Sequence, residues 1–288
     1  MSTTAQAFAE FLTSIEPTPW QLETLIPARK NTVVKNLETA FPSGSDMPFS
    51  KADLIGSAAK STIIRPIDDI DVLAVFSNAG KAFERYQYNS RDFLYRVRRA
   101  YDGLEAHQVG ARGQAVRVFF DQGGHVDVAP VFFAGGDDYL LPAGDGSWIR
   151  TSPLKQVKWF NDKNAGLSYH LRPRVRLLKA WNHAHSSRLK SFHLETVTAN
   201  VFSSMSGNHR DGLAKFFEWA QTRLTVSDPG GHGGDLSGYL SWSARQDVIA
   251  SFASARTRAA AAQAAEASGN HAEAKRLWRI VLGSDFPA

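Results

Sequence analysis

Three acidic residues in this chain have the type and spacing that could hold divalent metal ions. Asp69 and Asp71 open the apolar run at residues 70–76, and Asp127 lies inside a second apolar, β-branched run. Because side chains alternate along a strand, Asp69 and Asp71 point to the same face. If the two strands are neighbours, three carboxylates converge. Such hard oxygen ligands suit Mg²⁺, and two ions about 3.5–4 Å apart can activate a hydroxyl and stabilise a leaving oxygen.

A glycine–serine pair upstream fits the same chemistry. Ser57 follows Gly56 and stands 12 residues before Asp69. Glycine lets the backbone approach a phosphate closely. The Ser57 hydroxyl and nearby amides can donate to phosphate oxygens, above all if residues 58–61 begin a helical turn.

Each acid also has an alternative explanation without metal. Asp69 and Asp71 could be a solvated strand end, and Asp127 could be a half-exposed strand residue paired with Arg117. Asp68 is out of phase with the pair, and we interpret it as a loop or capping residue.

The elements that must position these residues change character along the chain. Apolar spacing predicts helices at 4–15 and 20–41, the second kinked at Pro27, and then strands at 52–57 and 70–76. A helix follows at 81–101. The strands at 114–121 and 125–133 form a predicted hairpin around 122–124, and a weaker hairpin follows at 139–150.

The second half is helical. Periodicity predicts helices at 154–165, 173–184, 192–205, 212–224, 241–266 and 272–282, with a structured Gly- and Asp-rich loop at 227–239. The fold class is therefore α+β, with a mixed β-sheet lobe and a C-terminal helical lobe sharing an active-site cleft. We place the domains at residues 1–152 and 153–288.

Composition narrows the classes of protein. The 288 residues carry a net charge of +5, which suits a partner rich in phosphate. The chain has no cysteine, so disulfides and cysteine zinc sites are excluded. No apolar run approaches the ~20 residues of a membrane span, and the first residues do not resemble a secretory signal. We expect a cytoplasmic protein with no membrane partner.

These motifs resemble the nucleotidyltransferase superfamily related to DNA polymerase β, in which the residues IGS, DIDV and VDV match. In the helical half, LLKAWN at 177–182 and KSFHLE at 190–195 resemble oligoadenylate synthases and cyclic GMP-AMP synthase. The Ala-rich helix, Trp278 and the GSDFP ending resemble the bacterial branch, the CD-NTases of anti-phage CBASS systems. The resemblance covers roughly residues 20–288.

The resemblance implies roles for the acids and the serine. Asp69 and Asp71 would bind both of two Mg²⁺ ions, with Mn²⁺ as a substitute. Asp127 would bind the ion that activates the acceptor hydroxyl. Ser57, next to Gly56, would hold the donor triphosphate.

Three residues of the helical half also match binding positions. Lys179 matches a lysine that contacts phosphates. Ser191 would donate to a phosphate or base, and Phe192, where cyclic GMP-AMP synthase has Tyr, would stack a base. The alternatives are a partly buried helix lysine and a core aromatic.

The expected activity is two-metal transfer that joins NTPs, ATP first, into a cyclic di- or trinucleotide second messenger for anti-phage signalling. A regulatory partner protein is compatible with this. Activation by duplex DNA is not expected, because the chain lacks cysteines and a comparable His cluster for a zinc insertion. One alternative is a nucleotidyltransferase that makes a linear product or modifies RNA, protein or a small molecule. Another is a non-catalytic nucleic-acid-binding module.

Overall fold

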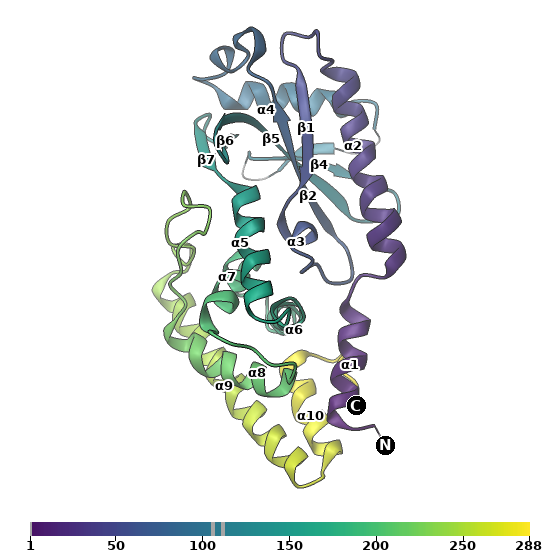
Figure 1. The fold of residues 1–288 in the computed structure, drawn as a ribbon, viewed down its shortest axis with the longest axis vertical. Coiled ribbons are helices and arrows are strands. Elements are labelled where there is room, and N and C mark those ends of the chain that lie inside the picture. Colours follow the sequence, from purple (N-terminus) through teal and green to yellow (C-terminus); the bar gives the residue numbers. More distant parts are fainter. Residues whose placement is uncertain (1, 105–106, 111–112) are drawn as a thin grey trace.

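A computed structural model describes residues 2–104, 107–110 and 113–288. Figure 1 shows a sheet lobe at the top, a helical lobe below it, and helix α5 (Pro153–Gly166) leading from one to the other. The expected α+β fold, with a mixed sheet and a C-terminal helical lobe, is confirmed.

The sheet has seven strands among the described residues, in the order β1-β2-β5-β4-β3, with β6 pairing with both β5 and β7. In the part of the sheet that the structure describes, β2 and β5 are the one parallel pair, and the other pairs are antiparallel. Both predicted hairpins are present, as β4–β5 and β6–β7. The strands are β1 (Phe49–Leu54), β2 (Asp69–Phe76), β3 (His107–Val109), β4 (Val116–Phe119), β5 (His125–Gly135), β6 (Asp138–Pro142) and β7 (Trp148–Thr151).

Alternation along β2 decides which face carries the acids. Ile70, Val72, Ala74 and Phe76 join the larger core of the sheet lobe, which includes residues of α2 (Ile26–Ala40) and α4 (Ser90–Arg98). The residues between them, such as Leu73, belong to a small cluster on the other face, against which Leu154 of α5 packs. Asp69 and Asp71 are in phase with Leu73, so they share the face opposite α2 and α4.

The helix predicted at residues 20–41 is interrupted next to Pro27, as expected. Residues Gln21–Leu25 form a π-helical turn, in which the amide of Ile26 donates to the carbonyl of Gln21. Pro27 has no amide hydrogen, so the regular helical ladder cannot pass through it. Helix α2 then begins at Ile26 with Pro27 in its first turn.

The C-terminal lobe has the six predicted helices. Its core is rich in aromatic side chains, and Trp181 packs against Phe217 and Phe252 with ring centroids 5.2 Å apart in both pairs. The helices are α5 (Pro153–Gly166), α6 (Leu171–Ala184), α7 (Ser191–Val201), α8 (His209–Trp219), α9 (Trp242–Ala267) and α10 (His271–Leu282).

Helix α1 (Thr4–Ile15) packs with the helical lobe. Phe8 meets Trp278 and Phe286 edge to face, at 5.0 Å in both pairs, and both chain ends lie beside α10 in Figure 1. The division of the chain at 152/153 stays a prediction. We propose that α1 be counted with residues 153–288, because its apolar face belongs to the core of that lobe.

Two predicted elements were wrong. The helix expected at 81–101 is reduced to α4, because Asn89 caps a new helix start with its side chain and two short 3₁₀ turns precede it. The strand expected at 52–57 ends at Leu54, and Gly56–Ala59 form the short helix α3. Strand β3 was not predicted.

Among the residues that the structure describes, no helix is both long enough and apolar enough to cross a membrane.

Candidate active site

The parallel pairing of β2 with β5 brings the acids together. Asp71 lies directly opposite Asp127, and Asp69 lies opposite His125. Partners in register project from the same face of a sheet, so Asp127 shares the face of Asp69 and Asp71. Three carboxylates from two adjacent strands therefore gather at one end of the strand pair.

The loop after β1 is built against Asp71. The amide of Ile55 donates to the carbonyl of Asp71 at 3.0 Å, which extends the β1–β2 ladder by one bond. Gly56 follows with a φ of +61°, and a β-carbon at this position would lie 2.0 Å from Oδ2 of Asp71. Only glycine satisfies both conditions, so Gly56 lets the start of α3 approach the carboxylate.

Asp71 is in an unfavourable environment for an isolated carboxylate. Burial, followed by the negative charges of Asp69 and Asp127, raises the pKa of the Asp71 carboxyl to about 6. A cation bound between the carboxylates would relieve both effects. The donor set of Asp69 and Asp71 therefore fits a hard divalent ion such as Mg²⁺.

Asp127 has a partner of the opposite charge on its other side. Arg117 of β4 lies opposite Asp127 in the sheet and donates from Nε and an Nη atom to its two carboxylate oxygens, both at 2.8 Å. This is the ion pair named above as the alternative explanation. Across the described residues, no three His, Cys, Asp or Glu side chains are arranged to hold one metal ion. A metal role for Asp127 remains a prediction, in which a cation would compete with Arg117 for this carboxylate.

A cavity of about 200 Å³ opens beside the acids, between the sheet lobe and the helical lobe. Asp69 and Asp71 line it, whereas Asp127 is not part of its lining. Five further residues singled out from the sequence also line it: Gly56, Ser57, Lys179, Ser191 and Phe192. The structure thus gathers residues that the sequence separates by up to 136 positions (192 − 56).

The sequence analysis missed a buried charge cluster at the back of this cavity. Glu195 of α7 is 2% exposed and forms ion pairs with Lys60, which follows α3, and with Lys179 of α6, the latter at 2.7 Å. The hydroxyl of Thr62 donates to the same carboxylate at 2.5 Å. Three segments from both lobes are therefore joined by one carboxylate.

The cluster sets the charge state of its acid. Burial alone would raise the pKa of the Glu195 carboxyl, but the charges and hydrogen bonds of Lys179 and Lys60 outweigh it and lower the pKa to about 2. A signal was available in the sequence. Glu195 lies among apolar residues of the KSFHLE motif, and a buried acid on a helix needs counter-charges.

Phe192 lies at the cavity wall and is half-buried. The Nζ of Lys60 lies 4.7 Å from the centroid of its ring. The ring is therefore accessible from the cavity and is not a fully enclosed core aromatic. Its stacking on a base remains a prediction.

The balance of charge in the lining restricts what can bind. Four carboxylates line the cavity, from Asp68, Asp69, Asp71 and Glu195, against the ammonium groups of Lys60 and Lys179. Both ammonium groups are already paired with Glu195. A polyphosphate could therefore enter this cavity only together with cations.

Residues 1–164 match the family of Second Messenger Oligonucleotide or Dinucleotide Synthetase domains. The chain belongs to this family. It is a CD-NTase, an enzyme of the polymerase-β-like nucleotidyltransferases. The motifs of the sheet lobe indicated the superfamily, and the C-terminal segment indicated the branch.

Curated relatives agree with this family. A probable cyclic nucleotide synthase of Bacillus cereus (strain VD146) is 24% identical over 272 residues, covering 81% of each chain. A cyclic AMP-AMP-AMP synthase of Escherichia coli (strain MS 115-1) is 30% identical over 190 residues, which are 61% of this chain and 59% of that protein.

Solved structures share the fold over nearly the whole chain. CdnC of E. coli MS115-1, solved with ATP, has a TM-score of 0.78 at 19% identity. The superposition covers 98% of this chain and 98% of CdnC. DncV of Vibrio cholerae, solved with a linear pppA(3′,5′)pG intermediate, has a TM-score of 0.77 at 15% identity, with 99% of this chain and 97% of DncV covered.

Proposed function

We propose that this enzyme condenses nucleoside triphosphates, ATP among them, into a cyclic di- or trinucleotide second messenger for anti-phage signalling. The observation that carries the proposal is the acidic pair on β2 in the lining of the cavity, with the Gly56–Ser57 loop against it. The relatives named as cyclic nucleotide synthases support the same product class.

Asp69 and Asp71 would hold two Mg²⁺ or Mn²⁺ ions, and Asp127 would join one of them in competition with Arg117. Bound ions would neutralise triphosphate charge and lower the pKa of an attacking ribose hydroxyl. The buried cluster of Lys60, Lys179 and Glu195 gives the inner wall of the cavity a fixed shape for the donor nucleotide.

The side chains at the rim would orient the donor. The Ser57 hydroxyl, at the start of α3, would donate to a phosphate oxygen, and Ser191 would donate to a phosphate or base. Phe192 would stack the base, since one side of its ring borders the cavity. The acceptor ribose hydroxyl then attacks the α-phosphorus of the donor, the bond to the bridging oxygen breaks, and pyrophosphate leaves. A second such step on the linear product closes the ring.

The test is incubation of the purified chain with the four labelled NTPs and Mg²⁺ or Mn²⁺, followed by mass spectrometry of phosphatase-treated products. A phosphatase-resistant cyclic nucleotide is expected. Asp69→Asn and Asp71→Asn should abolish it without lowering the melting temperature, because they remove negative charge from a crowded carboxylate site. The matched control is Asp121→Asn, at an exposed hairpin residue outside this cavity.

Two other outcomes would contradict the proposal. A labelled RNA, protein or linear product would support the group-modifying alternative. Salt-dependent nucleic-acid binding without pyrophosphate release from any NTP would support the non-catalytic module. CdnC of E. coli has been solved in complex with a HORMA protein. We therefore include a regulatory protein partner in the proposal, and the assay is to be repeated with a HORMA protein added.

A further inference from the structure

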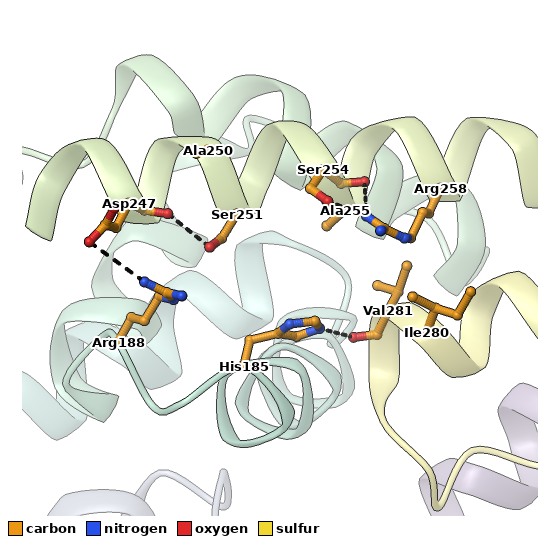
Figure 2. A pocket seen from close by; sticks show the side chains of 10 residues that line it. All are labelled: His185, Arg188, Asp247, Ala250, Ser251, Ser254, Ala255, Arg258, Ile280 and Val281. Carbon is orange, nitrogen blue, oxygen red and sulfur yellow. Dashed lines mark hydrogen bonds and ion pairs between the residues drawn. The ribbon is translucent and has the colours of Figure 1, made fainter.

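The helical lobe contains a second cavity, of about 270 Å³, that shares no lining residue with the active site. It lies between α9, the end of α10 and the connection from α6 to α7 (Figure 2). In Figure 2 the guanidinium groups of Arg188 and Arg258 enter it from opposite sides and point toward its middle.

Neither arginine is neutralised by a close carboxylate. Arg258 hydrogen-bonds only within its own helix, to the hydroxyl of Ser254 and to its carbonyl at 3.3 Å, and within the described part of the chain it forms no ion pair. Arg188 reaches Asp247 at 3.9 Å, at the limit of an ion pair, and the Asp247 side chain is 66% exposed. Asp247 is the one acid of the lining, so the cavity wall carries net positive charge.

The rest of the wall is partly polar and partly apolar. The Nε2 of His185 donates to the carbonyl of Val281 at 3.0 Å, which fixes the ring at the cavity floor and leaves Nδ1 as its second polar atom. Ile280 and Ala255 add apolar surface. Two inward-pointing guanidinium forks match the oxygens of a phosphate, and the apolar wall fits an organic group attached to it.

We propose that this cavity binds a small phosphate monoester, with Arg188 and Arg258 holding the phosphate group. The volume exceeds what one inorganic ion fills, and the apolar part of the wall would contact the remainder of the metabolite. Nothing in this binding requires the acids of the active site.

Binding here is linked to the active site by a short, tightly held segment. Arg188 belongs to the connection between α6 and α7, and two residues separate it from Ser191 and Phe192 of the active-site wall. The Asn182 side chain accepts from the amide of Leu189 at 3.0 Å and donates to its carbonyl at 2.8 Å, so Leu189, between Arg188 and the active-site wall, is fastened to α6. A ligand held by Arg188 would therefore lie one short segment away from the wall that is proposed to contact the donor base, a relation that rests on the proposed function.

The test is calorimetric titration of the full chain with inorganic phosphate and, separately, with ribose 5-phosphate, without NTPs. We expect ribose 5-phosphate to bind more tightly than phosphate, and Arg188→Gln or Arg258→Gln to weaken it about tenfold or more. Arg256→Gln is the matched control, because Arg256 lies on the same helix, 52% exposed, and pairs with Glu218 outside the cavity.

Asp247→Asn is expected to change the affinity for ribose 5-phosphate in the opposite direction. It removes the one acid of the lining, so it should tighten ribose 5-phosphate binding, which a purely structural role of these residues would not produce. The proposal is overturned if Arg188→Gln and Arg258→Gln, both folded by circular dichroism, bind as well as Arg256→Gln. It is also overturned if phosphate binds as tightly as its ester. Because the titration involves no turnover, its failure is distinct from failure of the proposed catalytic function.

Discussion

At Gly56 the backbone conformation directly affects the position of Asp71, a proposed metal ligand. Its positive φ and the 2.0 Å approach of a hypothetical β-carbon to Oδ2 of Asp71 leave no room for a side chain. We expect Gly56→Ala to lower the initial rate of nucleotide product formation at least about a hundredfold, because the shift displaces a proposed metal ligand. The melting temperature should fall only modestly, since backbone strain of this kind costs about 1–3 kcal/mol.

A matched glycine separates this effect from general sensitivity to substitution. Gly44 has an ordinary φ and no atom within 4 Å of a β-carbon. Gly44→Ala should leave both the rate and the melting temperature unchanged. Equal activity of Gly56→Ala and Gly44→Ala would show that the loop does not position Asp71.

Arg117 competes with cations for Asp127. Its two hydrogen bonds of 2.8 Å hold both carboxylate oxygens, and its positive charge opposes the approach of a divalent ion. We expect Arg117→Gln to lower the Mg²⁺ concentration needed for half-maximal activity. The measurement is a Mg²⁺ titration of initial rate, with Arg223→Gln, at an exposed site in the helical lobe, as the control. An unchanged or higher Mg²⁺ requirement would mean that Asp127 works while paired with Arg117.

At the scale of elements, the packing of α3, α6 and α7 against one another depends on the buried carboxylate of Glu195. Removing the charge of Glu195 leaves Lys60 and Lys179 buried without a counter-ion, which typically costs about 3–5 kcal/mol. We expect Glu195→Gln to lower the free energy of unfolding by about this amount at pH 7. Glu218→Gln, which breaks a half-exposed pair with Arg256, should lower it by less than about 1 kcal/mol.

The same carboxylate gives a pH dependence with a defined sign. The pKa of Glu195 is lowered from 4.5 to about 2 in the folded chain, so the unfolded state takes up its proton first as the pH falls. The stabilisation is complete above about pH 4.5 and is lost between about pH 4.5 and 2. Urea unfolding of wild type and Glu195→Gln across this range should show their difference shrinking. A difference that stays constant with pH would assign the loss to packing instead of charge.

Local sequence patterns predicted the elements well where one pattern covered a whole element. Alternation in β2 and β5 was enough to place Asp69, Asp71 and Asp127 on one face once the strands paired. The pair of Arg117 with Asp127 was named from the sequence only as an alternative, because its formation depends on strand order. That Glu195 holds Lys60 and Lys179 was not predicted, because it depends on contacts between the lobes. The helix expected at 81–101 failed because the cap at Asn89 outweighed the apolar spacing.

At the level of the whole chain, the N-terminal helix connects the two lobes. Phe8 and Phe11 pack into the helical core, while the amide of Arg65, in the segment before β2, donates to the carbonyl of Ile15 at 2.8 Å. The side chains of α1 therefore contact the C-terminal lobe. The last residue of α1, Ile15, contacts the loop that leads to Asp69. Helix α1 is therefore in contact with both lobes at the same time.

Substitutions in the aromatic cluster of Phe8, Phe11 and Phe286 test how strongly α1 and the C-terminal segment stabilise each other. Phe286 lies 5.0 Å from Phe8 and 5.3 Å from Phe11, ring centroid to centroid, and is 1% exposed. Phe286→Ala should therefore lower the free energy of unfolding by about 3–5 kcal/mol in urea. Combined with Phe8→Ala, the loss should fall short of the sum of the two single losses, because the first substitution already removes the contact between the rings. Tyr88→Ala, at a side chain 90% exposed, is the control and should change stability by less than about 0.5 kcal/mol. Strict additivity of the two Phe substitutions would mean that α1 and the chain end are stabilised independently, despite the contact between the two rings.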